Sequence, residues 1–326
     1  MTGAAGALTV SGGEQIFSGA NDYTGTTTVS GGTLRLTGSG TTGAAGNNLT
    51  VSSTGTLAMV DANLVVNNLS LASRGVISAP SGLSTLTANG TSSIAGTITT
   101  SGNQRYVGAV TLTANTSLVS GTGNITFGST INGTTADTES LSLNAGASGV
   151  ITFGGAVGGS VRLSDLVITN AGSLALGANT TINIPNAFTL NKPLAGAGYS
   201  LGVANNAIIS AAISGLSTIS IGGTTSLGGS VTTTGTQTYT GAVVLAATST
   251  LTTNNADISF GSTVNSNGST PYGLILANGS GTSTFGGIVG ATNALASLTT
   301  ATGSTSLVGD VNTTGAQTYG GNVLLN

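Results

Sequence analysis

The chain has 326 residues, of which only 4% are charged, and it contains no Cys, His or Trp. The missing Cys excludes a disulfide framework and thiolate metal sites, and the missing His removes the usual neutral-pH proton carrier and the commonest transition-metal ligand. Five basic and eight acidic residues give a net charge of −3, which is too little positive charge to neutralise many phosphates, so we expect no nucleic-acid partner. We also expect no cofactor.

The residue choice along the chain favours strands over helices or disorder. Gly (54 residues) is abundant beside Thr, Ser, Asn and Val, all of which are weak helix formers, and no long run has helical spacing. Apolar residues make up 38% of the chain, whereas charged residues and Pro, which are common in disordered chains, are scarce. No apolar run approaches the roughly 20 residues of a membrane-spanning helix, so membrane contact is expected only through a segment outside this sequence.

The N-terminal part repeats itself. TGAAGALTVS from Thr2 resembles TGAAGNNLTVS from Thr42, which corresponds to two units of about 20 residues each. The first residues, MTGAAGALTV, lack the basic region and apolar core of a signal peptide, and the last residues, GGNVLLN, stop inside a repeat. We therefore expect a fragment of a longer protein.

The middle and C-terminal parts repeat at nearly constant steps. Aromatic residues recur at steps of roughly 21 to 26 residues in two copies, as Tyr106, Phe127, Phe153 and as Tyr239, Phe260, Phe285. The stretch from Thr224 to Val243 returns about 80 residues later, from Ser304 to Val323. Residues 180–221 lie outside these matches, and we expect them to form additional, diverged coils.

These periods predict an all-β fold, a β-solenoid whose short strands pair in parallel with those of the next coil, about 4.8 Å away. At roughly 21 residues per coil, residues 1–326 would form one continuous solenoid of about 15 coils. Tracts such as TLTANTSLV, LILA and VVLAATSTL are the expected strands. Asn pairs are expected at corners, where Asn tolerates positive φ: Asn47-Asn48, Asn67-Asn68, Asn205-Asn206 and Asn254-Asn255. The uneven steps leave open whether the 80-residue unit holds three long coils or four short ones.

One short motif, G-x-[QN]-x-[YF]-x-G, occurs five times. Its copies begin at Gly13, Gly19, Gly102, Gly235 and Gly315. In the copy from Gly235, strand alternation predicts that Gln237 and Tyr239 point inward with Gly241 and Val243. We expect Gly235 at a corner, Gly241 beside the ring to give it room, and Gln237 in an amide ladder along the stack. The alternative interpretation is that the aromatic rings are exposed platforms on which sugars stack.

The copy from Gly19 continues as GANDYTGTTTVSGGTLRL to Leu36, and this stretch closely resembles the autotransporter-associated β-strand repeat of bacterial type V secreted proteins. The matching residues are Gly19, Asn21, Tyr23, Thr24, Gly25, Thr27, Val29, Gly32, Leu34 and Leu36. Residues 1–101 thus look like autotransporter-repeat coils, and residues 102–326 resemble the degenerate repeats of filamentous-haemagglutinin-type adhesins. The resemblance implies a single-stranded, right-handed parallel β-helix passenger that is exported across the outer membrane. The repeat marks a scaffold, so it transfers no functional residue to this chain.

A few charged residues and Thr-rich stretches are candidates for chemistry or ligand binding. Asp137 and Glu139 stand two residues apart in NGTTADTES, a spacing that puts both side chains on one side of a strand and could serve glycoside hydrolysis or a weak calcium site. A solvated loop is the favoured interpretation of that stretch. Arg162 with Asp165 is expected to form a surface ion pair. Thr arrays such as TTTVS, TLTAN, TITTS and VTTTG would suit an ice-binding face only if T-x-T recurred at one place in every coil.

The sequence therefore predicts a non-catalytic protein with no assigned catalytic, cofactor-binding or metal-binding residue. Its expected role is a structural stalk or adhesive scaffold on the outer surface of a bacterium or in the extracellular space. Expected partners are glycans or proteins of a host or neighbouring cell, and further copies of the chain that associate end to end or side by side. The alternatives are a self-assembling filament or surface-layer subunit, which exposed strand edges would favour, a carbohydrate-active β-helix enzyme, and an ice-binding solenoid.

Overall fold

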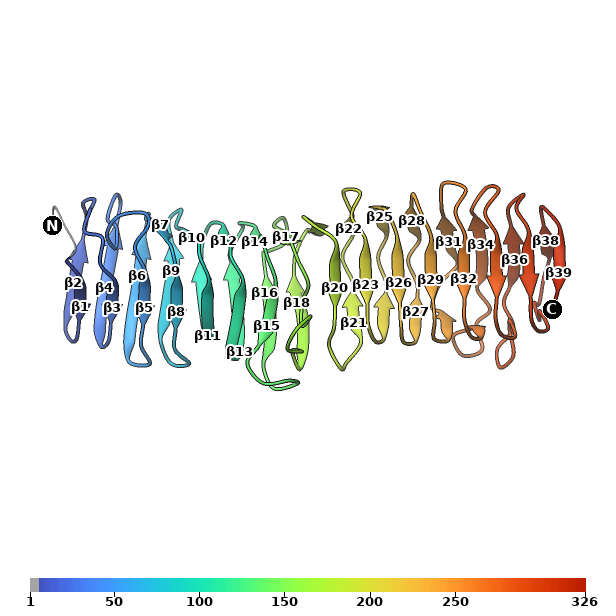
Figure 1. Ribbon diagram of the computed structural model, residues 1–326, viewed down its shortest axis with the longest axis horizontal. Coiled ribbons are helices and arrows are strands. Elements are labelled where there is room, and N and C mark those ends of the chain that lie inside the picture. The colour runs from blue at the N-terminus through green and yellow to red at the C-terminus, as the bar shows by residue number, and fades with distance from the viewer. Residues whose placement is uncertain (1–5) are drawn as a thin grey trace. The chain divides into compact units, whose positions relative to one another are not determined.

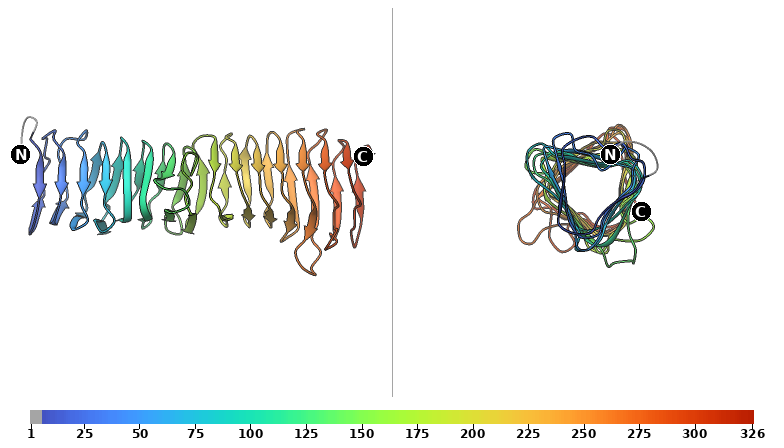
Figure 2. Two further views of the ribbon diagram at one scale, coloured as in Figure 1. Left: turned by 60° about the horizontal axis from the view of Figure 1, so that its bottom comes forward. Right: turned by 90° about the vertical axis from the view of Figure 1, so that its left-hand side faces the viewer.

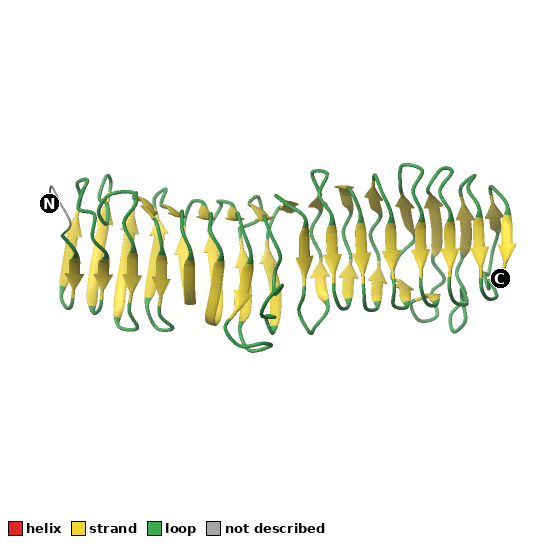
Figure 3. Cartoon of the chain, in the orientation of Figure 1, coloured by secondary structure: helices red, strands yellow, loops and turns green. Residues whose placement is uncertain are grey.

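The computed structural model describes residues 6–326, and these residues form strands, turns and loops with no helix (Figures 1 and 3). Strands pair in parallel, one turn with the next, in a β-solenoid arrangement of about 15 turns, which confirms the predicted fold class. The contacts between Cα atoms divide the chain into two compact units, residues 1–174 and residues 175–326, which are described separately. The first residues of the TGAAG repeat that begins at Thr2 lie outside the described residues.

The strands of unit 1 occupy three sides of its solenoid. The first side contains β1 (Leu8–Val10), β3 (Thr27–Val29), β5 (Leu49–Val51), β8 (Leu69–Leu71), β15 (Ile131–Gly133) and the first halves of β11 (Ser92–Thr100) and β13 (Val110–Ser120). The second side contains β2 (Glu14–Phe17), β4 (Gly32–Thr37), β6 (Gly55–Val60), β9 (Val76–Ser81), β16 (Ser140–Asn144), β18 (Asp165–Asn170) and the second halves of β11 and β13. The third side contains β7 (Asn63–Val66), β10 (Thr85–Ala88), β12 (Gln104–Tyr106), β14 (Ile125–Phe127) and β17 (Val150–Phe153).

Unit 2 also has three sides, and β19 (Ser173–Leu176) contains the boundary between the units. The first side contains β20 (Thr180–Ile182), β23 (Leu201–Val203), β26 (Ile219–Ile221), β29 (Gln237–Tyr239), β32 (Ile258–Phe260), β35 (Ser283–Phe285), β37 (Thr305–Leu307) and β39 (Val323–Leu325). The second contains β21 (Phe188–Leu190), β24 (Ala207–Ile209), β27 (Thr225–Leu227), β30 (Val243–Leu245), β33 (Val264–Ser266) and bridges at Val289 and Val311. The third contains β22 (Leu194–Ala195), β25 (Ile213–Leu216), β28 (Val231–Thr233), β31 (Ser249–Thr252), β34 (Gly273–Ala277), β36 (Ser297–Thr300) and β38 (Gln317–Tyr319).

Most strands have three residues, of which the outer two point inward and the middle one points outward. In β5, Leu49 and Val51 are buried and Thr50 is half-buried. This alternation follows from the two-residue period of a strand, and it places an aliphatic side chain over an aliphatic side chain in the next turn, as where Leu49 pairs with Leu69. The core of each unit is therefore a set of stacked rows, and each turn is stabilised by its neighbours (Figure 2).

All four Asn pairs lie at corners, as expected, but the physical reason is different for most of them. Among these eight residues only Asn255 has a positive φ (56°). Corner side chains instead accept a hydrogen bond of 2.7–3.1 Å from a backbone N–H of the following turn. The side-chain oxygens that do so include those of Asn48, Asn68, Asn103, Asn124, Asn179, Asn206, Asn255 and Asp257. A short amide or carboxylate side chain thus replaces a backbone acceptor where the strand ladder is interrupted.

The 80-residue repeat holds neither three long coils nor four short ones. From β29 the first side continues through β32 and β35 to β37, which is three turns, and the chain then passes Val311 to reach β38 on the third side. The copy at Gln317–Tyr319 consequently lies two sides further round the solenoid than the copy at Gln237–Tyr239, although the two copies have nearly the same sequence. The repeat preserves the local strand-and-corner sequence without preserving the side on which it lies.

Candidate functional site

The repeated motif encloses its polar groups in one hydrogen-bonded cluster inside the solenoid. In β29, the Tyr239 hydroxyl donates to Gln237 Oε1 at 3.0 Å. Gln237 Nε2 donates to the carbonyl oxygen of Val231 at 3.1 Å and to that of Thr252 at 2.9 Å. Both side chains are fully buried, and burial raises the pKa of Tyr239 far above its usual value. The cluster therefore joins β29 from within to two neighbouring strands of the third side, β28 and β31.

The same cluster surrounds Tyr106 in unit 1. Its hydroxyl donates to Gln104 Oε1 at 2.9 Å, and Gln104 Nε2 donates to the carbonyl oxygens of Ile98 at 3.3 Å and Val119 at 2.8 Å. Burial raises the pKa of Tyr106 as well. The predicted Gln ladder is wrong, because the neighbours of Gln237 in adjacent turns are Ile219 and Ile258 and its amide bonds to backbone instead.

The aromatic steps seen in the sequence correspond to continuous stacks of rings. Tyr106 and Phe127 have ring centroids 5.5 Å apart and planes inclined by 16°, and Phe153 continues this stack in register. Tyr239 and Phe260 are 5.4 Å apart and inclined by 14°, and Phe285 continues the second stack. Both Tyr rings are fully buried, so the sugar-platform interpretation is wrong for them and the core interpretation is confirmed.

The copy at Gln317–Tyr319 makes the same internal bonds at an exposed turn. Tyr319 donates to Gln317 Oε1 at 2.9 Å, and Gln317 Nε2 donates to the Val311 carbonyl oxygen at 2.9 Å. A Thr two residues before the motif Gly completes the cluster in each of these three copies, where its hydroxyl donates to that Gly's carbonyl oxygen: Thr100 to Gly102, Thr233 to Gly235 and Thr313 to Gly315. Our sequence motif omitted this Thr, although its spacing is constant and T-x-G-x-[QN]-x-Y would have found it.

Both glycines of the motif lie at corners of the solenoid. Gly235 lies in the bend between β28 and β29, as expected. Gly241 was expected to make room beside the ring, but it lies beyond the end of β29, where an added Cβ would overlap the backbone of Gly223 in the preceding turn. The equivalent Gly25 approaches the backbone of Gly6 in the same way. The last Gly of the motif therefore permits close stacking of corners.

The two N-terminal copies differ from the others in their contacts. At the first turn Gln15 is exposed and Phe17 is only half-buried. In the copy from Gly19, the Tyr23 hydroxyl lies 2.7 Å from Thr27 Oγ1, which donates to the carbonyl oxygen of Thr42, and burial raises the pKa of Tyr23. Asn21 Nδ2 donates to the Thr41 carbonyl oxygen at 2.9 Å. A common sequence pattern thus supports two different polar arrangements.

Asp137 and Glu139 lie in a turn between β15 and β16, which confirms a loop and shows that the placement of both carboxylates on one strand face is wrong. The expected solvation holds for Asp137 but not for Glu139. Glu139 is buried and accepts hydrogen bonds from the hydroxyls of Thr134 and Thr138 and from the backbone N–H of Thr135. Burial by itself would raise the pKa of Glu139, but these hydrogen bonds to the charged form lower it below its usual value. A carboxylate held charged in this way is a poor general acid.

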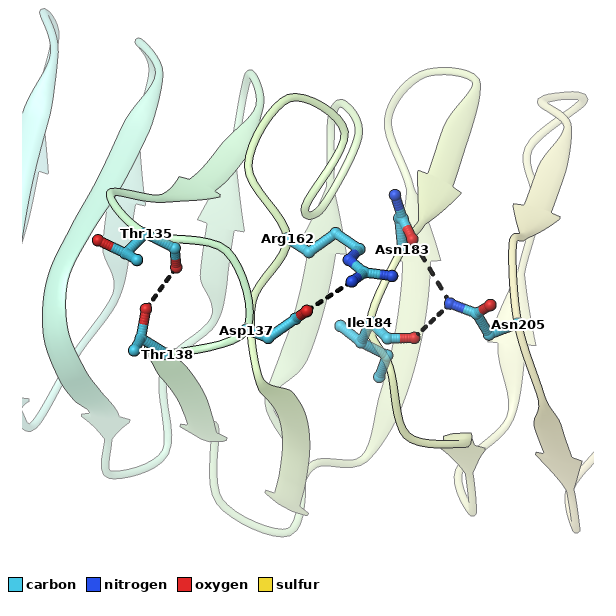
Figure 4. Close-up of polar contacts among 7 residues, drawn as sticks. All are labelled: Thr135, Asp137, Thr138, Arg162, Asn183, Ile184 and Asn205. Atoms are coloured by element: carbon cyan, nitrogen blue, oxygen red, sulfur yellow. Dashed lines mark hydrogen bonds and ion pairs between the residues drawn. The ribbon is translucent and has the colours of Figure 1, made fainter.

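Asp137 forms an exposed ion pair with Arg162 of the next turn (Figure 4). Asp137 has a positive φ of 62°, and its backbone N–H donates to the Arg162 carbonyl oxygen at 3.1 Å. The expected pair of Arg162 with Asp165 is therefore wrong, because Asp165 accepts from the backbone N–H of Leu166 at the start of its own strand. Figure 4 also shows a second contact between turns, in which the Asn205 side-chain amide donates to the carbonyl oxygen of Ile184 in the preceding turn.

The Thr arrays do not recur at one place in successive turns. In TTTVS and VTTTG the side chains of Thr27 and Thr233 are buried. In TITTS both Thr97 and Thr99 point outward, but their partners in the next turn are Ser117 and Val119, so no second T-x-T lies beside the first. Within residues 6–326, no three Asp or Glu residues gather as they would around a metal ion, and no helix is long and apolar enough to cross a bilayer.

A known protein family matches the same N-terminal stretch that contains the two overlapping motif copies. Residues 11–36 match the passenger-associated-transport-repeat family. The match begins before β2, covers both overlapping motif copies and ends within β4, and it confirms the resemblance to autotransporter passenger repeats. The stretch that matches this repeat therefore forms part of a parallel β-solenoid, in which β2 pairs with β4. No curated protein and no solved structure matches the chain.

Proposed function

We propose that this chain is a non-catalytic passenger scaffold of a bacterial exported protein, a stalk or adhesive rod segment that acts at the outer cell surface. The observation that carries the proposal is the passenger-associated-transport repeat at residues 11–36, built into a solenoid whose turns contact only their neighbours. Such a chain needs no distant contacts and can fold turn by turn as it leaves the membrane. The absence of Cys agrees with this route, because no disulfide can form and hinder passage of the chain.

The non-catalytic part of the proposal is supported by the contacts of the carboxylates. Glu139 is held by three neighbouring Thr residues, and Asp137 is paired with Arg162. Polysaccharide breakdown by the purified chain that disappears in Asp137→Asn or Glu139→Gln would show that the chain is instead a carbohydrate-active enzyme. We expect no such activity.

Surface labelling of intact cells tests the proposal directly. The natural full-length protein would be produced in its own bacterium with an epitope inserted in the exposed loop at Asn267–Pro271, and antibody binding and protease sensitivity would be measured before and after lysis. We expect labelling and cleavage on intact cells. Labelling that appears only after lysis would refute the proposed location, and long polymers of the purified chain in electron micrographs would favour a filament subunit over a stalk.

A further inference from the structure

A single file of hydroxyl groups runs along the first side of unit 1. The middle, outward residues of successive strands are in register with one another, from Thr9 through Thr28, Thr50, Ser70 and Ser93 to Thr111. We call this file the hydroxyl row. Neighbouring members are one strand spacing apart, about 4.8 Å. The row therefore offers one hydroxyl, a donor and an acceptor, per turn over six consecutive turns.

These hydroxyls are available to a ligand. Within the part of the chain that the structure describes, the side-chain hydroxyls of Thr28, Thr50, Ser70, Ser93 and Thr111 make no hydrogen bond to the protein. Corner hydroxyls behave differently, since Thr91 donates to Asn68 Oδ1 and Thr54 donates to the Ser30 carbonyl oxygen. The hydroxyl row has thus kept its hydrogen-bonding capacity for solvent or a bound molecule.

The middle of the row forms the floor of a shallow groove of about 290 Å³. Thr50, Ser70 and Ser93 line this floor. Four corner residues, each directly before a strand, also line the groove, and we call them its wall: Thr26, Asn48, Asn68 and Thr91. The side-chain oxygens of Asn48 and Asn68 already accept from the next turn, so the amide Nδ2 groups are the atoms that remain to donate into the groove. None of the residues that line this groove is charged.

We propose that this groove binds a neutral, linear polysaccharide, so that this side is the adhesive face of the scaffold proposed above. Sugar hydroxyls both donate and accept, which matches a floor of Ser and Thr hydroxyls and a wall of amide donors. The lack of charge disfavours anionic glycans, which would need Arg or Lys for their carboxylate or sulfate groups. The groove supplies no aromatic ring, so each contact is weak, and affinity must come from repetition of contacts from turn to turn along the solenoid axis.

The second unit provides a matched control. Its first side also presents outward hydroxyls in register, including Ser220, Thr238 and Ser259. The corner residues at the places of Asn48 and Asn68 are here Thr218 and Thr236, so this row lacks the amide wall. The variant Thr50→Val/Ser70→Ala and the control Ser220→Ala/Thr238→Val remove the same groups from the two rows and retain β-branched or small side chains.

Binding would be measured by affinity electrophoresis and calorimetry with the purified chain, using a linear β-glucan, a linear α-glucan and an anionic polygalacturonate. We expect a neutral glucan to bind, its affinity to rise with oligosaccharide length, and the Thr50→Val/Ser70→Ala variant to bind about tenfold more weakly while the control variant is unchanged. No binding of either neutral glucan, equal loss in both variants, or preference for polygalacturonate would each overturn the proposal. Circular dichroism and thermal unfolding would confirm that both variants are folded. Glucan binding without labelling of intact cells would refute the proposed location and leave the groove assignment standing.

Discussion

Replacing Gln237 by Leu should destabilise the turns around β29 more than any exposed substitution. The amide of Gln237 satisfies two buried carbonyl oxygens and accepts from the buried Tyr239 hydroxyl. Leu fills much of the same volume but makes none of these bonds. Each net hydrogen bond contributes about 0.5–1.5 kcal/mol, and a buried hydroxyl left without a partner costs about 1–3 kcal/mol, so we expect a loss of about 3 kcal/mol.

A cycle of variants separates the hydrogen bonds from packing. Gln237→Leu combined with Tyr239→Phe removes the stranded hydroxyl together with its acceptor, so the double variant should be more stable than Gln237→Leu alone. Gln317→Leu is the control, because Gln317 accepts from Tyr319 and donates to the carbonyl oxygen of Val311 in an exposed strand, where water can replace these bonds. Its expected loss is below about 1 kcal/mol.

Hydrogen exchange of the amides in β28, β29 and β32, together with urea unfolding, would measure these effects, since repeat proteins open locally as well as globally. Protection should fall in these strands for Gln237→Leu and recover in part in the double variant. Equal losses for Gln237→Leu and Gln317→Leu would falsify the reasoning, and so would a double variant less stable than Gln237→Leu.

The corners and the carboxylate loop give three further predictions. Gly241→Ala should destabilise unit 2 by about 1–3 kcal/mol in urea unfolding, because the added Cβ overlaps the backbone of the preceding turn. In the control Gly19→Ala the added Cβ meets open space, so stability should change by less than about 0.5 kcal/mol. Equal effects of the two substitutions would contradict the corner-stacking explanation. Asn206→Ala removes the acceptor of the Thr224 backbone N–H and should lower stability by about 1 kcal/mol and speed exchange of that amide, and unchanged exchange would argue against a role for the corner amide. The pKa of Glu139 is lowered in the folded chain, so the carboxylate contributes its full stability above the unfolded pKa and loses it as pH falls through the folded pKa. Amide exchange of the loop should therefore become faster at acid pH. Glu139→Gln should show no such pH dependence.

The aromatic stacks show what could be predicted from sequence. The nearly regular steps between Tyr106, Phe127 and Phe153 identified the length of a turn, and the rings stack because residues one turn apart in a solenoid lie in adjacent strands. The corner positions of the Asn pairs were predicted from the tolerance of Asn for positive φ. The main mechanism was not predicted, because positive φ is a property of one residue, whereas the observed bond joins a side chain to the backbone of another turn.

The carboxylate loop shows the opposite case. The spacing of Asp137 and Glu139 predicted that both lie on one side of a strand. They lie in a turn instead, where successive side chains point in different directions, and the two carboxylates contact different partners. The partner of Arg162 also lies one turn away, 25 residues back in the chain, where no local pattern points to it. Ion pairs and grooves of this kind depend on which turns become neighbours.

The sequence by itself determined the all-β class, the parallel stacking and the burial of Tyr106 and Tyr239, because period and alternation are set by strand geometry. Only the tertiary structure decided which side of the solenoid each copy occupies, since the phase of a side depends on the summed length of every strand and corner before it. The copies at Tyr239 and Tyr319, with nearly the same local sequence, consequently lie on different sides. The hydroxyl row has the same origin: its members are ordinary Ser and Thr in the chain, and they become one file only when their turns stack in register.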